Sequence, residues 1–255
     1  MQYFAIAALF FVIPVYLQTM QGYDALETGL KILPLSAGLI VFSVLGSWLT
    51  SRRSARRIAQ VGQITMAIGL LFVLIAIQPE LQGAPFAIGM FIVGGGFGLL
   101  ASQLGNVNMS AVEKEDTSEV GGLQGTFQNL GSSFGTAIVG SVFILLLSSG
   151  FAAAVGQNDK LLPEESAQVV AALEEGVPII SQDEAEKLVL DAGGSEEVAQ
   201  AVGEDYANSQ VEALKQAIFI IFGLMVLSLL LSRHLPAQIT AKPEEEPVGQ
   251  KPAAT

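Results

Sequence analysis

The chain has 255 residues, of which 51% are hydrophobic and only 14% are charged, and its formal net charge is −12. Because a soluble domain carries about 25% charged residues, this composition argues against a water-soluble globular protein. Cysteine is absent and the single histidine is His234, so no disulfide, metal or cofactor site is expected. No basic patch with interleaved aromatic residues indicates a nucleic-acid partner.

Six apolar segments fill most of the chain, and each is long enough to cross a bilayer, whose hydrocarbon core needs roughly 20 helical residues. The segments, in chain order, are Gln2–Met20, Leu30–Ser51, Ile58–Ile77, Pro85–Gly105, Leu123–Phe151 and Leu214–Arg233. They predict an all-α membrane protein with six transmembrane helices that has the lipid bilayer as its main partner. Pro14 and Pro34 lie inside apolar runs and predict local kinks.

The loop after the second segment predicts how the protein is oriented in the membrane. It carries four basic residues, Arg52, Arg53, Arg56 and Arg57. Short loops rich in Lys and Arg remain in the cytoplasm, so both termini are expected to be cytoplasmic in a multi-pass protein of the plasma (inner) membrane. The chain begins almost inside its first apolar segment, which suggests a fragment or a truncated reading frame.

An acidic insert separates the fifth and sixth apolar segments. Residues 151–212 hold 14 of the 24 acidic residues and only 2 of the 12 basic ones, and they are expected outside the cell. Ser181 followed by Glu184 predicts a helical capping box, and Gly193–Ser195 predicts another helix start. Short packed helices and a partly disordered loop remain alternatives. The expected division is residues 1–150 (five helices), 151–212 (insert), 213–234 (sixth helix) and 235–255 (disordered tail).

The interiors of the apolar segments carry amides but no central Asp, Glu, Lys or Arg. An ionisable residue at bilayer depth would mark an ion or proton site, so any coupling acid must lie elsewhere. A buried amide must be paired or hydrated. Interhelical hydrogen bonding and the lining of a substrate cavity are therefore both open for the candidate substrate-lining residues Gln103, Asn106, Asn108, Gln124, Gln128 and Asn129.

Glycine is concentrated in the fourth and fifth apolar segments, where several pairs lie four residues apart. Small residues at this spacing allow helix backbones to approach closely in lipid. The predicted helix-packing glycines are Gly94, Gly98, Gly121, Gly125, Gly131 and Gly135. The chain has no HExxH, GxSxG or phosphate-loop motif, so it is not expected to be an enzyme.

Three sequence blocks point to a known family. They are Pro14–Tyr23 with the following Leu33-Pro34, the loop Gly46–Arg57, and Gly121–Gly131. Residues 3–150 and the last apolar segment resemble the C-terminal half of the fourteen-helix drug:proton antiporter branch of the major facilitator superfamily. The loop resembles the superfamily's cytoplasmic motif, although Thr50-Ser51 stand where an acid is expected.

The resemblance implies one half-bundle of a major facilitator fold. Such transporters work by rocking two halves about a central site, so a missing N-terminal half or a second copy would be needed. The leading hypothesis is therefore the C-terminal half of a secondary-active efflux transporter for multiple drugs or small amphiphilic molecules, with the proton as the coupling ion. The alternative is a non-transporting membrane scaffold or interaction protein that uses the acidic outer insert.

Overall fold

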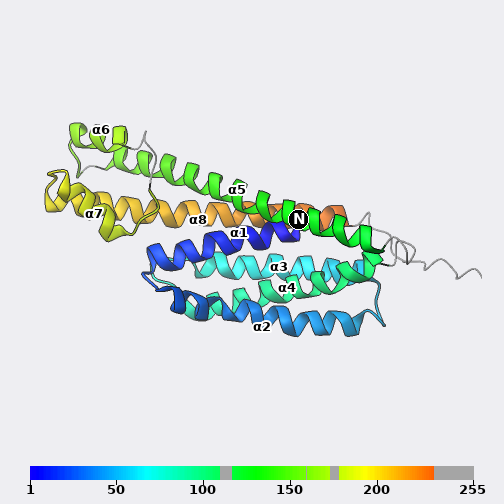
Figure 1. Ribbon diagram of the computed structural model, residues 1–255. Coiled ribbons are helices and arrows are strands. Elements are labelled where there is room, and N and C mark those ends of the chain that lie inside the picture. The colour runs from blue at the N-terminus through cyan, green and yellow to red at the C-terminus, as the bar shows by residue number, and fades with distance from the viewer. Residues whose placement is uncertain (110–116, 159, 173–177, 233–255) are drawn as a thin grey trace, which may run out of the picture.

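The helices run nearly side by side along one long direction (Figure 1). The computed structural model describes residues 1–109, 117–158, 160–172 and 178–232. For residues 104–109, 117, 118, 165, 168, 171 and 172, it describes the backbone but not the side chains. The elements are α1 (Gln2–Val15), η1 (Tyr16–Met20), α2 (Ala25–Leu49), α3 (Ala55–Ala76), α4 (Gly83–Met109), α5 (Thr117–Gln157), α6 (Pro163–Ala172), α7 (Gln182–Asp191) and α8 (Glu196–Ser232). Six helical segments in this part of the chain are long and apolar enough to cross a membrane, which confirms the six predicted spans.

Helix α4 packs between α2 and α3 through glycines. Gly94 lies against the backbone of Leu35 in α2, where an added Cβ would come within 2.7 Å of the Leu35 carbonyl carbon. On the opposite partner, a Cβ on Gly96 would meet the backbone nitrogen of Met66 in α3 at 2.5 Å. Lipid tails are as apolar as the side chains, so close backbone contact must supply the attraction between these helices.

The second group of helices consists of α1, α5 and α8, and α8 also packs on α3. The amide Nε2 of Gln63 in α3 donates to the Ser228 hydroxyl of α8 over 2.8 Å. This bond joins two helices that are 165 residues apart in the sequence. The shared core includes the fully buried side chains of Leu9, Tyr16, Met66, Leu70, Phe86, Met90, Phe143, Leu147, Leu214 and Ile218.

The far end of α1 is tied to the turn between α3 and α4. Pro14 lacks a backbone N–H and is followed by the π-helical turn η1. The Tyr16 hydroxyl donates to the Gln78 carbonyl over 2.7 Å, and the Gln21 amide donates to the Pro79 carbonyl over 2.8 Å. The backbone N–H of Leu81 donates to Gln21 Oε1 over 3.1 Å. The irregular turn after Pro14 is therefore held by named polar contacts.

Helices α5 and α8 are longer than a membrane requires. Their 41 and 37 residues correspond to roughly 61 and 55 Å of helix, against a hydrocarbon core of about 30 Å. They project beyond the other helices, and α6 and α7 pack on the projecting part (Figure 1). We call this part, α6 and α7 with the adjoining ends of α5 and α8, the helical cap. The expected boundaries at residues 151 and 213 fall inside these continuous helices.

A buried tyrosine organises the helical cap. The Tyr206 hydroxyl donates to the Pro178 carbonyl over 2.6 Å and accepts from the N–H of Ile180 over 3.2 Å. The Gln210 amide donates to both the Tyr206 hydroxyl and the Ile180 carbonyl. The Phe151 ring packs edge-on at 5.2 Å from the Tyr206 ring. Burial raises the pKa of the Tyr206 phenol above its ordinary value of 10.0.

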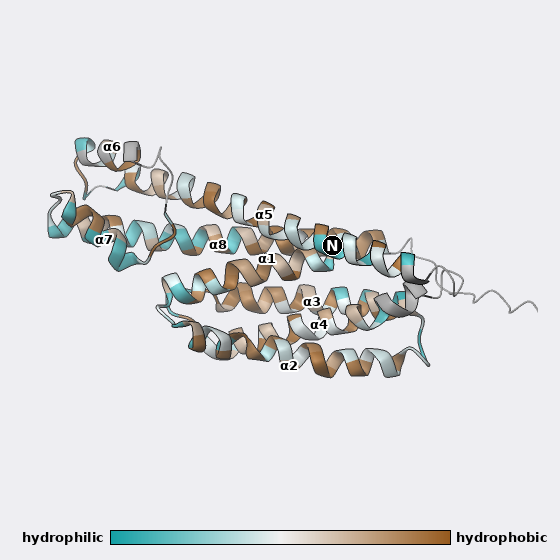
Figure 2. Ribbon diagram, in the orientation of Figure 1, coloured by the Kyte–Doolittle hydropathy of each residue, from teal (hydrophilic) through white to brown (hydrophobic). Residues whose placement is uncertain are grey.

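Two helix starts in the cap were predicted from sequence and are confirmed. Ser181 and Glu184 form the capping box of α7, with each side chain bonded to the other's backbone N–H. The Ser195 hydroxyl accepts from the N–H of Val198 at the start of α8. Between them, Gly193 takes φ +91°, a left-handed conformation that suits glycine after the end of a helix. The described part of the insert is therefore mainly helical. Hydrophilic residues are frequent on α6, α7 and the adjoining part of α8 (Figure 2). The expected disordered tail, 235–255, lies outside the described residues, as does His234.

Candidate substrate-facing site

Gln103, the first of the candidate substrate-lining amides, is only 2% exposed and joins α4 to α2. Its Nε2 donates to the Gly46 carbonyl at 3.2 Å and to the hydroxyls of Thr50 and Ser102 at 3.2 and 2.9 Å. This geometry favours interhelical hydrogen bonding over substrate contact for Gln103. Asn106 and Asn108 belong to α4 by their backbone, and their side chains lie outside the described residues.

The other three candidate amides lie on the first half of α5. Gln124 and Gln128 are half-buried, and Asn129 is exposed. Among the candidates whose side chains are described, Gln103 is a packing amide between α2 and α4, and the other three lie on α5.

Asn129 belongs to an exposed polar face of α5. This α5 polar face, spaced by four, three, four and three residues, consists of Gly122, Thr126, Asn129, Ser133 and Thr136. Residues at this spacing share one side of a helix. The hydroxyls of Thr126 and Thr136 donate to carbonyls one turn back. The Asn129 amide has no hydrogen-bond partner among the described residues, and an unpaired amide in hydrocarbon costs several kcal/mol.

A second exposed face of α5 has the opposite character. Its members are the large apolar side chains Leu123, Phe127, Leu130, Phe134 and Ile138, which are 46–65% exposed. This apolar face suits lipid, whereas Asn129 on the α5 polar face needs water, a solute or another protein surface to pair its amide. Sequence reasoning selected Asn129 but did not group it with Thr126, Ser133 and Thr136. Their spacing was the signal that could have identified them.

The glycines predicted to pack helices fall into two sets. Added Cβ atoms at Gly94, Gly98 and Gly135 would collide with backbone of a neighbouring helix, and Gly131 would be in ordinary contact with Tyr3 at 3.6 Å. Cβ atoms at Gly121 and Gly125 would meet no described atom within 4 Å. These two glycines therefore face away from the described helices, next to the α5 polar face.

The arginine turn, residues 52–57, connects α2 to α3. Arg52, Arg53 and Arg57 are exposed, and Arg56 is half-buried. The guanidinium of Arg52 lies 4.3 Å from the centre of the Trp48 ring, a cation–π contact. The ion pair among the described residues is Lys160–Glu204 at 3.9 Å, so these arginines form no ion pair within that part of the chain.

Thr50 is one of the two residues, Thr50 and Ser51, that stand where the arginine-turn motif has an acid, and it has a structural role. Thr50 donates its hydroxyl to the Gly46 carbonyl over 3.0 Å and accepts from Gln103. A neutral bond between α2 and α4 thus stands where the resemblance led us to expect a carboxylate.

In the described part of the chain, six helices of membrane length, several of them packed through glycine, define a polytopic membrane protein. The family model for the Major Facilitator Superfamily matches residues 1–136, more than half of the chain. The chain therefore belongs to the Major Facilitator Superfamily, and the resemblance found in the sequence is confirmed at that level.

Several curated relatives have names that describe transporters. The chain is 30% identical to the multidrug resistance protein Stp of Mycobacterium tuberculosis, over 58% of this chain and 27% of that protein. It is 23% identical to the probable actinorhodin transporter of Streptomyces coelicolor, over 95% of this chain and 46% of that protein. It is 32% identical to the uncharacterized transporter YebQ of Escherichia coli, over 50% of this chain and 28% of that protein.

The chain spans less than half the length of each of these relatives. A transporter family and transporter-named relatives agree with the expectation that the protein is not an enzyme.

Proposed function

We propose that this chain forms the C-terminal half of a secondary-active efflux transporter in the fourteen-helix drug:proton antiporter branch. Its substrates would be multiple drugs or other small amphiphilic molecules. Membership of the superfamily supports the transport mechanism, and the names of Stp and the actinorhodin transporter support export of drug-like molecules. Alternating access would require an N-terminal half or a second copy of the chain.

The observation that carries the proposal is the α5 polar face. Asn129 is exposed and without a described partner, next to Gly121 and Gly125, where an added Cβ would meet no described atom within 4 Å. An uncovered polar face beside an apolar one is expected where α5 meets both lipid and the central cavity between two halves. Gln124 and Gln128, both half-buried on the same helix segment, would border this cavity.

Charge placement supports the orientation and the coupling that we propose. The arginine turn would lie in the cytoplasm and the helical cap outside the plasma membrane. The described part of the six spans has no acid in its central turns, so the proton-carrying acid would lie in the other half.

Efflux of a fluorescent cationic dye tests the proposal in a drug-sensitive bacterium. The chain would be expressed alone and together with the N-terminal half of a relative. We expect efflux only in the second case, abolished by a protonophore and reduced by Asn129→Leu. Phe134→Leu on the apolar face of α5 is the matched control and should preserve efflux. Efflux by the chain alone as a monomer, or equal efflux in both variants, would contradict the proposal.

The helical cap keeps the scaffold alternative open, because it has its own buried core around Tyr206. Replacing residues 163–191 with a short flexible linker removes α6 and α7 but leaves α5 and α8 continuous. If the two-half system still exports dye, the cap is peripheral to transport. If no context gives export and the deletion abolishes capture of an outer partner, the chain is a scaffold.

A further inference from the structure

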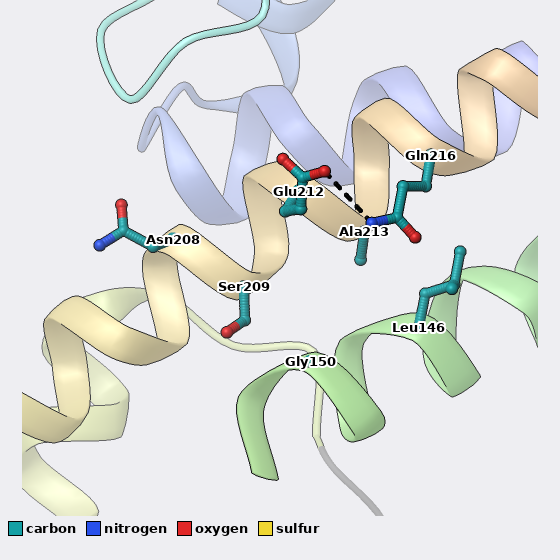
Figure 3. A pocket seen from close by; sticks show the side chains of 7 residues that line it. All are labelled: Leu146, Gly150, Asn208, Ser209, Glu212, Ala213 and Gln216. Carbon is teal, nitrogen blue, oxygen red and sulfur yellow. Dashed lines mark hydrogen bonds between the residues drawn. The ribbon is translucent and has the colours of Figure 1, made fainter. Parts of the chain in front are cut away.

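A small pocket lies between α5 and α8 where both helices leave the bundle and enter the helical cap. It has a volume of about 250 Å³. Figure 3 shows side chains from both helices around it; they are Leu146, Gly150, Asn208, Ser209, Glu212, Ala213 and Gln216. Gly150 leaves the space open, because a Cβ there would meet no described atom within 4 Å.

The pocket lies at the expected boundary of the bilayer. The apolar segment that predicts the sixth span begins at Leu214, inside α8. We therefore expect Glu212 to lie at the level of the lipid headgroups. Leu146 and Ala213 give the pocket apolar lining, and Phe219, 63% exposed, lies two turns past Glu212 toward the bilayer.

The polar groups of the pocket suit a cation that donates hydrogen bonds. The Glu212 carboxylate accepts one bond, from Gln216 Nε2 over 3.2 Å (Figure 3), and forms no ion pair with a described residue. Asn208 and Gln216 add amide oxygens, and the Ser209 hydroxyl donates to the Asp205 carbonyl, which leaves its lone pairs as acceptors. Lys215 is not among the pocket-lining residues.

The donor set does not suit a metal ion. Ca²⁺ takes six to eight oxygen ligands, and no group of three or more His, Cys, Asp or Glu side chains that could hold a metal occurs in the described residues. One carboxylate with amide and hydroxyl oxygens beside apolar walls fits an ammonium group carried on an alkyl chain. The volume is below the roughly 300–1,000 Å³ of pockets that enclose drug-sized ligands, so only the head of such a molecule fits.

We propose that the pocket between α5 and α8 binds the ammonium head of an amphiphile whose apolar tail stays in the adjacent leaflet. Glu212 supplies the charge, Gln216 orients the carboxylate, and Gly150 provides the space. Two sources share this chemistry, the ethanolamine headgroup of a phospholipid and a cationic amphiphilic compound. The site lies roughly 25 Å along α5 from Asn129, so it is separate from the α5 polar face.

Photo-crosslinking of the full chain, purified in a neutral maltoside detergent, tests this site. The probe is a long-chain alkylamine with a diazirine next to its ammonium group, and mass spectrometry locates the labelled peptides. We expect labelling within residues 146–150 and 208–216, competed by dodecyltrimethylammonium but not by dodecanol. Competition by lyso-phosphatidylethanolamine would assign the site to the lipid, and its failure would assign it to cationic amphiphiles.

Three variants separate the charge and the shape of the pocket from general surface effects. Glu212→Gln keeps the size of the side chain and should lower probe affinity by roughly three- to tenfold. Gly150→Leu should also lower it by filling the space. Glu204→Gln removes the same charge from the same helix outside the pocket and should leave affinity unchanged. Equal labelling in Glu212→Gln and the unmodified chain, an equal loss in Glu204→Gln, or competition by dodecanol would overturn the proposal. Circular dichroism confirms that each variant is folded.

Discussion

Replacing Gly94 with alanine tests whether α2 and α4 are held by direct backbone contact. The new Cβ would overlap the Leu35 carbonyl oxygen and lie 2.7 Å from the carbonyl carbon. Ordinary carbon–carbon contact is about 3.5–4.0 Å, so the two helices must separate by about 0.8 Å or more. A gap of this size forfeits a quarter to a half of the dispersion energy at each contact that opens.

The expected change in the free energy of unfolding is the sum of two opposing contributions. Overpacking against rigid backbone costs about 3 kcal/mol, the upper part of its usual range. Alanine regains about 1 kcal/mol over glycine inside a helix. Gly94→Ala should therefore lower the free energy of unfolding by about 2 kcal/mol and the Tm by roughly 4–8 °C.

Gly125→Ala is the matched control, because its Cβ would meet no described atom within 4 Å. This variant gains the helix propensity of alanine over glycine without the steric overlap, so its Tm should stay the same or rise by roughly 2–4 °C. Thermal unfolding of the purified chain in detergent, followed by far-UV circular dichroism, measures both variants. If Gly94→Ala unfolds at or above the temperature of Gly125→Ala, the close contact between α2 and α4 is refuted.

Three further predictions concern polar contacts. Gln103→Leu should lower the free energy of unfolding by about 1 kcal/mol, since its bond to the Gly46 carbonyl is lost; a more stable variant in the same thermal assay would show that the bond contributes nothing. Ser228→Ala should destabilise the chain by about 1 kcal/mol, because Gln63 Nε2 loses its partner, and the double variant with Gln63→Leu should recover part of that loss if the pair interacts. Because burial raises the pKa of Tyr206 in the folded cap, the stabilising contribution is complete below pH 10.0 and is lost as the pH rises through the folded-state pKa. The protection factors of the cap amides, which are corrected for the intrinsic rise of hydrogen exchange with pH, should therefore fall above pH 10 in the unmodified chain. They should fall less in Tyr206→Phe, which removes the titrating group.

The six spans and two helix starts in the cap could be predicted from the sequence, because hydropathy and capping are local properties. Membrane length fixes the number of apolar residues, and Ser181 with Glu184 satisfies the first backbone N–H groups of α7 within four residues. Both signals are complete within a short window of sequence. Neither depends on how distant segments pack.

Which amides are buried between helices and which are exposed could not be predicted in the same way. Gln103 and Asn129 look alike in sequence, and only the position of α2 buries one and not the other. The cap boundaries at 151 and 213 were placed where polarity changes, but a helix continues through a change of polarity when tertiary packing supports it. The pocket at Glu212 depends on the spacing of two helices that are about 60 residues apart in sequence, which no local pattern encodes.

The continuity of α5 has a mechanical consequence. A single helix of 41 residues, roughly 61 Å long, runs from the α5 polar face to the helical cap without a break in its described backbone. Such a rod acts as a lever: a tilt of about 10° at the end near Thr117 moves the far end by about 10 Å. Tyr206 and Phe151 fasten the partner rod, α8, to it at that far end. A small tilt of the membrane-spanning helices would therefore become a large displacement of the acidic surface of the helical cap. A molecule bound to that surface would be displaced with it.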